Sequence, residues 1–439
     1  MGNKIETTLK RKLPYRYRVL LLLFSLILVT YLDRVCISLV SVRIKNEFHL
    51  SNTKFGYVLG AFSLAYALFE IPAGILGDRI GQKKVFIRIV LWWSLLTALT
   101  GATTGFITLL IARFLFGMGE AGAFPNGCGT ISRWFPVTET SKGTSCLMIG
   151  SSAGAAIAPL IVIPIAVAYG WRAPFFVNGL IGLIWVLVCL LWFRNTPEEM
   201  RNISQSEKTL IENNRRFVPH KQVFPWNIAL RDRNIWALAL VAFCTQWALY
   251  FFIAWSPVYF QEGRHFSETT MKFVTSYLFV VGVIGGVTAG VFIDRLVKMK
   301  GIRSGRRLVG MIAMGMMCSL FIIAATTKSN LVASACLMFC YFFIPVSGIN
   351  YFSACVDIGK NNAGTVTGII NFVGSMGAFL ISVEFGRIAD ITHSLNAPLY
   401  VIAGVLFAGC LLWLLIDAGT PLAEKKLSTP RSYKVISHI

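Results

Sequence analysis

Twelve long apolar stretches constrain this chain more than any other feature of its sequence. A helix needs about 20 mostly apolar residues to cross about 30 Å of hydrocarbon. The 439 residues are 55% hydrophobic and only 14% charged, which is too apolar for a soluble domain of this length. The runs are continuous rather than alternating, so each predicts a membrane-spanning helix and not a strand of a barrel. The predicted spans are 19–40, 54–76, 85–106, 107–132, 144–168, 172–193, 235–260, 271–293, 308–327, 330–353, 363–387 and 397–416.

The positive charge of the chain is distributed unevenly between the loops. If the N-terminus is placed in the cytoplasm, 31 Lys and Arg residues fall in cytoplasmic segments and 8 fall in the segments of the other side. The remaining two, Arg34 and Arg113, lie inside predicted helices. The positive-inside rule therefore predicts that both termini are cytoplasmic. We expect a monomer in the lipid bilayer without a nucleic-acid partner, because no soluble domain remains to bind one, and we expect the first apolar stretch to be retained rather than cleaved.

The longest polar segment divides the predicted helices six and six. Residues 194–234 are basic and contain Pro197, Pro219 and Pro225, so they are expected to form a cytoplasmic linker. The predicted organisation is a cytoplasmic tail (1–18), a six-helix bundle (19–193), the linker (194–234), a second six-helix bundle (235–416) and a cytoplasmic tail (417–439).

The two bundles carry copies of one short motif. "GILGDR", beginning at Gly74, ends the second helix, and "GVFIDR", beginning 216 residues later at Gly290, ends the eighth with the same internal spacing. Two parallel six-helix repeats are one of the architectures of transporters, with a substrate site near the midplane where the repeats meet. The fold class predicted is therefore an all-α membrane protein of twelve transmembrane helices in two pseudo-symmetric bundles.

The stretch "GILGDRIGQKK" (74–84) resembles the signature of the loop between helices 2 and 3 in the major facilitator superfamily. Gly74 would permit close helix contact, Gly81 would permit a tight turn, and Asp78 would accept hydrogen bonds from backbone N–H groups at a nearby helix N-terminus. Asp78 and Arg79 are followed by Gln82, where that family more often has a basic residue. The motif indicates the fold and says little about the substrate.

Six further stretches resemble the anion:cation symporter family, which includes bacterial galactonate, hexuronate and glucarate transporters and animal sialic-acid carriers. The resemblance covers about residues 17–416 and implies a symporter that imports an organic anion with protons by alternating access. It also implies that Tyr31 and Tyr66 contact the substrate. The stretches are "YLDRVCIS", "FEIPAGILGDR", "RFLFGMGEAGAFPN", "GWRAPFFVNG", "WSPVYFQEGRHFS" and "GTVTGIINFVG".

Four charged residues lie at membrane depth in the first half of the chain. A charge at mid-helix depth costs about 2.5 to 3.5 kcal/mol on the insertion scale, so these residues must pair or face water. Their levels in helices 1 and 4 predict two crossed ion pairs. Arg113 and Glu120 share one face of a helix at i and i+7. The predicted pairs are Asp33 with Arg113 and Arg34 with Glu120; the alternative is that both pairs are purely structural.

These residues suggest how protons and an anion are coupled. Asp33, Arg113 and Glu120 are the proton-coupling candidates, because a proton on either carboxylate would free a guanidinium and leave net positive charge for an anion. Arg34 is the leading ligand, since its planar fork can bind a carboxylate at two points. Two carboxylates make two protons per anion possible.

Further substrate-binding candidates come from both halves. Tyr31 lies one turn before Arg34, although either Tyr31 or Tyr66 could instead pack against a neighbouring helix. Gln246 and Asn371 are polar at membrane depth, where hydroxyl recognition or an interhelical hydrogen bond would explain them. Ser151 is a weaker candidate in a run of small residues that favours close helix packing.

Two other carboxylates at membrane depth have simpler explanations. Glu70 lies near the cytoplasmic end of the second helix and is expected to belong to an inner gate. Glu384 is expected to pair with Arg387 at i, i+3.

The sequence contains no chemistry typical of a membrane enzyme. All five histidines fall in predicted loops or tails, so no metal site or histidine base is expected within the membrane. Neither G-x-S-x-G nor a P-loop occurs, and no cofactor is expected. A facilitative uniporter, a drug exporter and a sodium-coupled carrier remain as alternatives within transport.

The habitat and the substrate are less closely defined. The loop between helices 1 and 2 is short and no outer loop has an N-x-S/T acceptor, which favours a bacterial inner membrane. Aldonates, uronates and aldarates are the favoured anions, ahead of aromatic or simple carboxylates.

Overall fold

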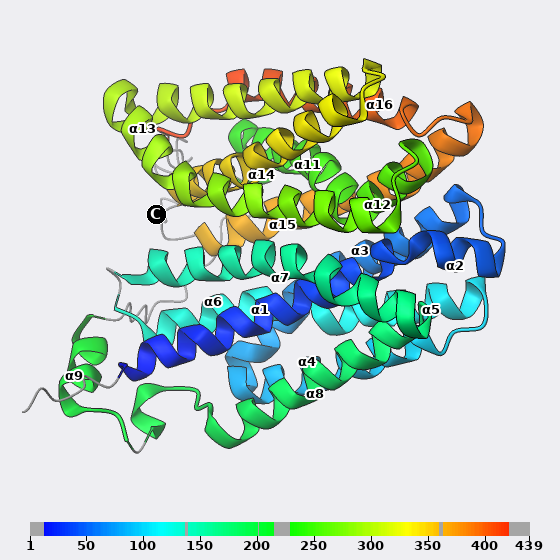
Figure 1. Ribbon diagram of the computed structural model, residues 1–439. Coiled ribbons are helices and arrows are strands. Elements are labelled where there is room, and N and C mark those ends of the chain that lie inside the picture. The colour runs from blue at the N-terminus through cyan, green and yellow to red at the C-terminus, as the bar shows by residue number, and fades with distance from the viewer. Residues whose placement is uncertain (1–12, 137–138, 201, 215–228, 360–362, 421–439) are drawn as a thin grey trace, which may run out of the picture.

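The computed structural model describes residues 13–136, 139–200, 202–214, 229–359 and 363–420 as a bundle of helices (Figure 1). The first half contains α1 (Tyr15–Leu39), α2 (Ser41–Phe48), α3 (Asn52–Ile80), α4 (Gln82–Gly101), α5 (Phe106–Glu120), α6 (Ala123–Trp134), α7 (Thr140–Tyr169) and α8 (Ala173–Trp192). The linker contributes a 3-10 turn (Pro197–Glu199) and α9 (Gln205–Asn214). The second half contains α11 (Arg233–Tyr250), a π-helical turn (Phe251–Trp255), α12 (Ser256–Val258), a second π-helical turn (Tyr259–Gly263), α13 (Glu268–Thr326), α14 (Asn330–Gly359), α15 (Ala363–Thr392), α16 (Ala397–Leu412) and a 3-10 turn (Trp413–Leu415).

Eleven helical segments within the described residues are long and apolar enough to cross a membrane. One of them, α13, runs for 59 residues but turns at Gly301, whose φ is 79°. A Cβ added to Gly305 would lie 2.7 Å from the Cα of Val297, so the chain reverses direction at this turn. Because α13 therefore supplies two spans, the described residues contain twelve spans, the number that the apolar runs predict.

Two of the predicted spans are interrupted by prolines. The fourth breaks between α5 and α6, directly after Glu120, because in a continuous helix Pro125 could not donate to the carbonyl of Ala121 and its ring would clash with that carbonyl. The seventh passes through π-helical turns around Pro257, which cannot donate to the carbonyl of Ile253. That carbonyl instead accepts a hydrogen bond of 2.8 Å from the Oγ of Ser38 in α1.

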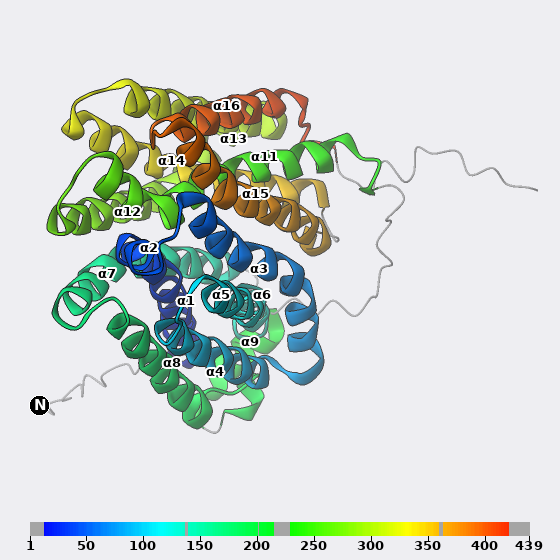
Figure 2. The same ribbon diagram turned by 90° about the vertical axis from the view of Figure 1, so that its right-hand side faces the viewer.

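The helices form two bundles, α1–α8 and α11–α16, which lie one above the other in Figure 1. Figure 2 views their common end from the right-hand side of Figure 1 and shows α2 at the junction of the bundles. We call this end, which carries Arg43, Lys45, Asn52, Glu262 and Asp390, the tied end. The opposite end, which carries the start of α1 and the linker helix α9, is called the linker end.

Apolar side chains join the bundles near the tied end. One buried cluster contains residues from both halves, among them Phe55 of α3 and Trp255 and Phe385 of the second half. The rings of Phe55 and Trp255 meet edge to face at 6.1 Å. Gly56 lets the helices approach closely, because a Cβ there would lie 2.6 Å from the carbonyl oxygen of Ser382 in α15.

Polar side chains reinforce this junction. Arg43 binds Glu268 through two hydrogen bonds of 2.9 and 2.8 Å, and Lys45 contacts Glu262 at 2.7 Å. Asp390 accepts hydrogen bonds from the start of α3 in the opposite bundle. The two bundles are therefore fastened together at the tied end, where α2 and the start of α3 meet the second π-helical turn, the start of α13 and the end of α15.

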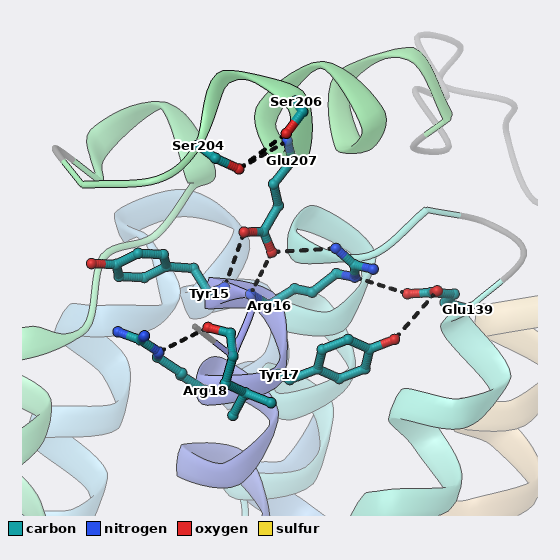
Figure 3. A network of polar contacts seen from close by, with 9 residues as sticks. Tyr15, Arg16, Tyr17, Arg18, Glu139, Ser204, Ser206 and Glu207 are labelled. Carbon is teal, nitrogen blue, oxygen red and sulfur yellow. Dashed lines mark hydrogen bonds and ion pairs between the residues drawn. The ribbon is translucent and has the colours of Figure 1, made fainter. Parts of the chain in front are cut away.

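The linker helix is anchored to the first bundle at the linker end (Figure 3). Glu207 of α9 accepts hydrogen bonds of 3.0 Å from the backbone N–H groups of Tyr15 and Arg16, which begin α1. The side chain of Arg16 extends between Glu207 and Glu139, which lies 3.0 Å from it. The carboxylate of Glu207 thus caps a membrane helix, an arrangement that the positive end of the helix dipole favours.

Candidate functional site

A buried ion pair joins Arg34 of α1 to Glu120 at the end of α5. The Nε of Arg34 donates to the Oε1 of Glu120 at 2.9 Å, and an Nη of the same guanidinium contacts the same oxygen. Arg34 is 8% exposed and Glu120 is fully buried. This is one of the two crossed ion pairs predicted from the sequence.

Aromatic rings surround the guanidinium of Arg34. Its carbon lies 4.7 Å from the ring of Tyr31, 4.9 Å from that of Phe62 and 5.0 Å from that of Tyr66. Tyr31 is one turn before Arg34 on α1, whereas Phe62 and Tyr66 are one turn apart on α3. A ring face attracts a cation, so these contacts hold the charge in place without neutralising it.

The second predicted ion pair, between Asp33 and Arg113, is absent from the described residues, and that prediction was wrong. Both carboxylate oxygens of Asp33 and the Nε of Arg113 are buried without a hydrogen-bond partner in the described part of the chain. Arg113 turns along α5 so that its guanidinium lies 4.5 Å from the ring of Phe116 and 5.2 Å from that of Phe62. Helix spacing gives the level of each Cα but not the rotamer, and the rotamer separates these two groups.

Asp33 is nevertheless part of the same charged cluster. Its carboxylate lies close enough to Glu120 and Arg113 for their charges to act on it. The four groups therefore form one electrostatic cluster in which only Arg34 and Glu120 are bonded to each other. A buried carboxylate without a partner is costly in its charged form, so Asp33 is the least satisfied member of the cluster.

A small cavity of about 10 Å³ adjoins the cluster where the bundles meet. Tyr250 of the second half lines it opposite Arg34 and Arg113. The sequence analysis did not identify Tyr250, although it lies one helical turn after Gln246 and the i, i+4 rule would have placed it on the same face. The other lining residues are Ser38, Leu59, Phe62, Ile253 and Ala254.

The polar candidates of the second half, Asn371 and Gln246, lie on α15 and on the neighbouring α11. The Nδ2 of Asn371 in α15 donates a hydrogen bond of 2.6 Å to the Oε2 of Glu70 in α3. Gln246 faces Gly374, one turn after Asn371, because a Cβ on Gly374 would lie 3.4 Å from the Cγ of Gln246. Ser151 donates to the carbonyl of Met148 in its own helix at 2.7 Å.

The loop motif lies at the linker end, away from this cluster. Gly74 faces Pro125, and Gly81 turns with a φ of 89°. Arg79 is exposed. The expectation that Asp78 accepts from backbone N–H groups was wrong, since Asp78 is 77% exposed at its side chain and lies 3.8 Å from Arg133 instead. The N–H group of Lys83, one residue into α4, is bound by the Oδ1 of Asn195 at 2.8 Å.

The expected helical pair near the tied end is present. Glu384 lies 3.5 Å from Arg387, three residues further along α15, and the Arg387 side chain is 61% exposed.

A family model of the Major Facilitator Superfamily matches residues 23–382. The chain belongs to the major facilitator superfamily. It is a multi-pass membrane transporter of that superfamily and not an enzyme, as the sequence predicts.

Several named members of the superfamily resemble this chain over most of its length. A probable sulfoacetate transporter of Cupriavidus necator is 30% identical over 93% of this chain and 95% of its own. The hexuronate transporter of Bacillus subtilis is 28% identical over 90% and 92%. The D-galactonate transporter of Escherichia coli is 27% identical over 91% and 95%. These names describe anion carriers, in line with the family resemblance seen in the sequence.

Solved structures of other transporters confirm the predicted fold class. A bacterial homologue of the human lysosomal transporter Spinster, described as inward-facing and unoccupied, matches 95% of this chain and 98% of its own with a TM-score of 0.74 and 18% identity. A D-xylose–proton symporter matches 92% and 99% with a TM-score of 0.74 and 16% identity.

Proposed function

We propose that the protein is a proton-coupled symporter that imports an organic anion, with a sugar acid as the favoured substrate, across a bacterial inner membrane. The observation that carries this proposal is the ion pair between Arg34 and Glu120 at the junction of the bundles. A guanidinium held by a buried carboxylate can exchange that partner for the carboxylate of a substrate, provided that the first carboxylate is neutralised. The named relatives carry hexuronate and galactonate, which supports the choice of sugar acids.

The coupling follows from charge balance within the cluster. When Glu120 is ionised it occupies Arg34, and an anion must compete with it for the same guanidinium. A proton on Glu120 removes that competition and leaves Arg34 with its full charge among Tyr31, Phe62 and Tyr66. Anion binding is therefore favoured by the proton, and the two must be linked reciprocally.

Asp33 supplies a second place for a proton in this mechanism. It is buried and accepts no hydrogen bond from the described residues. A monoanion moving with one proton is neutral and gains nothing from the membrane potential, whereas each further charge gains about 2.3 kcal/mol per 100 mV. Protonation of both carboxylates would make import of a monoanion electrogenic.

Within this proposal, the contacts at the tied end define which side of the transporter is closed. If the linker end is cytoplasmic, as the positive charge predicts, the tied end faces the outside. The ties of Arg43, Lys45 and Asp390 then close the outer side, so a substrate bound at Arg34 in this state cannot leave toward the outside. Import requires these ties to break and re-form in each cycle.

The proposal is tested by transport in proteoliposomes without sodium. The wild-type protein should accumulate an aldonate or uronate above equilibrium when the pH gradient is imposed, and a protonophore should abolish the accumulation. Arg34→Ala should weaken substrate binding about thirtyfold or more, because truncating one partner of a buried charge pair costs several kcal/mol. The exposed Arg88→Ala serves as the matched control. Accumulation that requires sodium, or exchange without accumulation, would contradict proton coupling.

Sulfoacetate is the alternative substrate to a sugar acid. Sulfoacetate is a short dianion, and its named carrier is similar to this chain over nearly the full length. Competition by unlabelled sulfoacetate against uptake of a labelled sugar acid decides between them. Inhibition at concentrations well below those of the sugar acids would favour sulfoacetate.

A further inference from the structure

Glu70 and Asn371 form a polar contact between the bundles away from the tied end. The hydrogen bond of 2.6 Å joins α3 to α15, and both side chains are half-buried. The other hydrogen bonds between the two bundles in the described part of the chain involve Ser38, which lies closer to the tied end, and four residues at the tied end itself: Arg43, Lys45, Asn52 and Thr53. Packing at the tied end therefore does not explain the Glu70–Asn371 contact.

Glu70 lies one helical turn beyond Tyr66, the residue of α3 whose ring contacts Arg34. Tyr66, whose ring lies 5.0 Å from the Arg34 guanidinium carbon, is one turn before Glu70 on α3. At 1.5 Å per residue, the backbone of Glu70 is about 6 Å further along the helix than that of Tyr66. An anion bound to Arg34 and long enough to reach past Tyr66 would meet the carboxylate of Glu70 and the amide of Asn371.

We propose that Glu70 selects the substrate by charge, favouring anions with a carboxylate at one end and hydroxyl groups at the other over dianions of the same length. This inference rests on the proposed function. Hydroxyl groups can donate to the carboxylate of Glu70 and accept from the amide of Asn371, so a polyhydroxy chain replaces the bond between these two side chains. A second carboxylate on the substrate would instead face the like charge of Glu70, and like charges placed together disfavour binding.

The named relatives leave this choice open. Hexuronate and galactonate are monoanions, whereas sulfoacetate and galactarate are dianions, and carriers of both kinds resemble this chain at 27–30% identity. Family likeness therefore does not predict how many charges the substrate carries. The placement of Glu70 predicts a substrate with a single carboxylate.

The test compares two acids with the same carbon chain. Binding of galactonate and of galactarate to the purified full-length protein is measured by titration calorimetry for the wild type, Glu70→Gln and Glu384→Gln. The control Glu384→Gln removes a carboxylate from α15 that is paired with Arg387 at the tied end. The wild type and the control should bind galactonate at least about tenfold more tightly than galactarate. In Glu70→Gln, galactarate should gain about tenfold while galactonate changes less than about threefold.

The outcomes separate this inference from the proposed function. If the wild type binds both acids equally and Arg34→Ala loses both, the Glu70 inference is overturned and the anion site stands. Retention of the tenfold preference in Glu70→Gln overturns the inference in the same way. If the wild type binds neither acid, the sugar-acid function fails, and the Glu70 inference fails with it.

Discussion

Asp390, in the last turn of α15, accepts hydrogen bonds from the backbone N–H groups of Thr53 at 2.8 Å and Asn52 at 3.2 Å, which begin α3 in the opposite bundle. The hydroxyl of Thr53 and the amide of Asn52 donate to the same carboxylate. A carboxylate at a helix N-terminus is stabilised by the helix dipole and by the free N–H groups. One bundle thus caps a helix of the other, and this cap exists only while the tied end is closed.

Asp390→Asn should shift the protein toward a state with the tied end open. The substitution removes the charge and one acceptor oxygen, and hydrogen bonds to charged groups contribute about 1.5–3 kcal/mol each, so the population ratio should change by about tenfold or more. Spin labels at positions 54 and 387, which are exposed on α3 and α15, report the distance between these ends. Asp294→Asn, at the other end of the molecule, should leave the distances unchanged. An unaltered distribution in Asp390→Asn would show that the cap does not hold the closed state.

Gly56→Ala should disfavour the same closed junction by steric contact. The added Cβ would lie 2.6 Å from the carbonyl oxygen of Ser382, and a backbone atom cannot move aside as a flexible side chain can. Transport should slow several-fold and the label distances should lengthen. The matched control is Gly290→Ala, where no atom lies within 4 Å of the new Cβ. Equal transport by the two variants would contradict close approach of α3 and α15 in the cycle.

Glu207→Gln should lower the stability of the protein without affecting substrate affinity. The linker helix uses this carboxylate to cap α1 and to contact Arg16 (Figure 3). Loss of a charged cap costs about 1–2 kcal/mol, which should appear as a lower melting temperature in detergent. Glu212→Gln changes an exposed carboxylate of the same helix and should have no effect. If both variants have the melting temperature of the wild type, α9 does not anchor α1.

Asp33→Asn should reduce the number of protons moved per anion. If both carboxylates carry protons, import of a monoanion moves one net positive charge, and loss of the Asp33 proton makes it electroneutral. Reversal potentials in proteoliposomes with clamped pH and potential measure this ratio directly. An unchanged charge-to-substrate ratio in an active Asp33→Asn protein would remove Asp33 from the coupling.

The sequence predicts the fold well because lipid allows few solutions. Each apolar run must satisfy its own backbone hydrogen bonds, so hydropathy alone identifies the spans. The turn at Gly301 and the breaks at Pro125 and Pro257 follow from the backbone limits of these two residue types. Pro257 leaves the carbonyl of Ile253 without its helical donor. The donor that replaces it, Ser38, could not be predicted because it lies 215 residues before Ile253 in the chain.

The site is predicted only in part because side-chain rotamers depend on the packed environment. The spacing of residues along α5 and the opposite directions of α1 and α5 correctly predict the pair between Arg34 and Glu120. The same reasoning fails for Asp33 and Arg113, since the rotamer of Arg113 places its guanidinium beside the rings of Phe62 and Phe116 and leaves Asp33 without a hydrogen-bond partner among the described residues. The contact between Glu70 and Asn371 joins helices from different bundles, and no periodicity within either helix encodes it.

The most direct test of the coupling mechanism is the transport behaviour of Glu120→Gln. The neutral side chain leaves Arg34 permanently available, so the variant should exchange labelled for unlabelled substrate at a rate within about tenfold of the wild type. It should fail to accumulate substrate against its gradient when a pH gradient is imposed. Uphill uptake by Glu120→Gln equal to that of the wild type would contradict the proposal that protonation of Glu120 releases Arg34 to the anion.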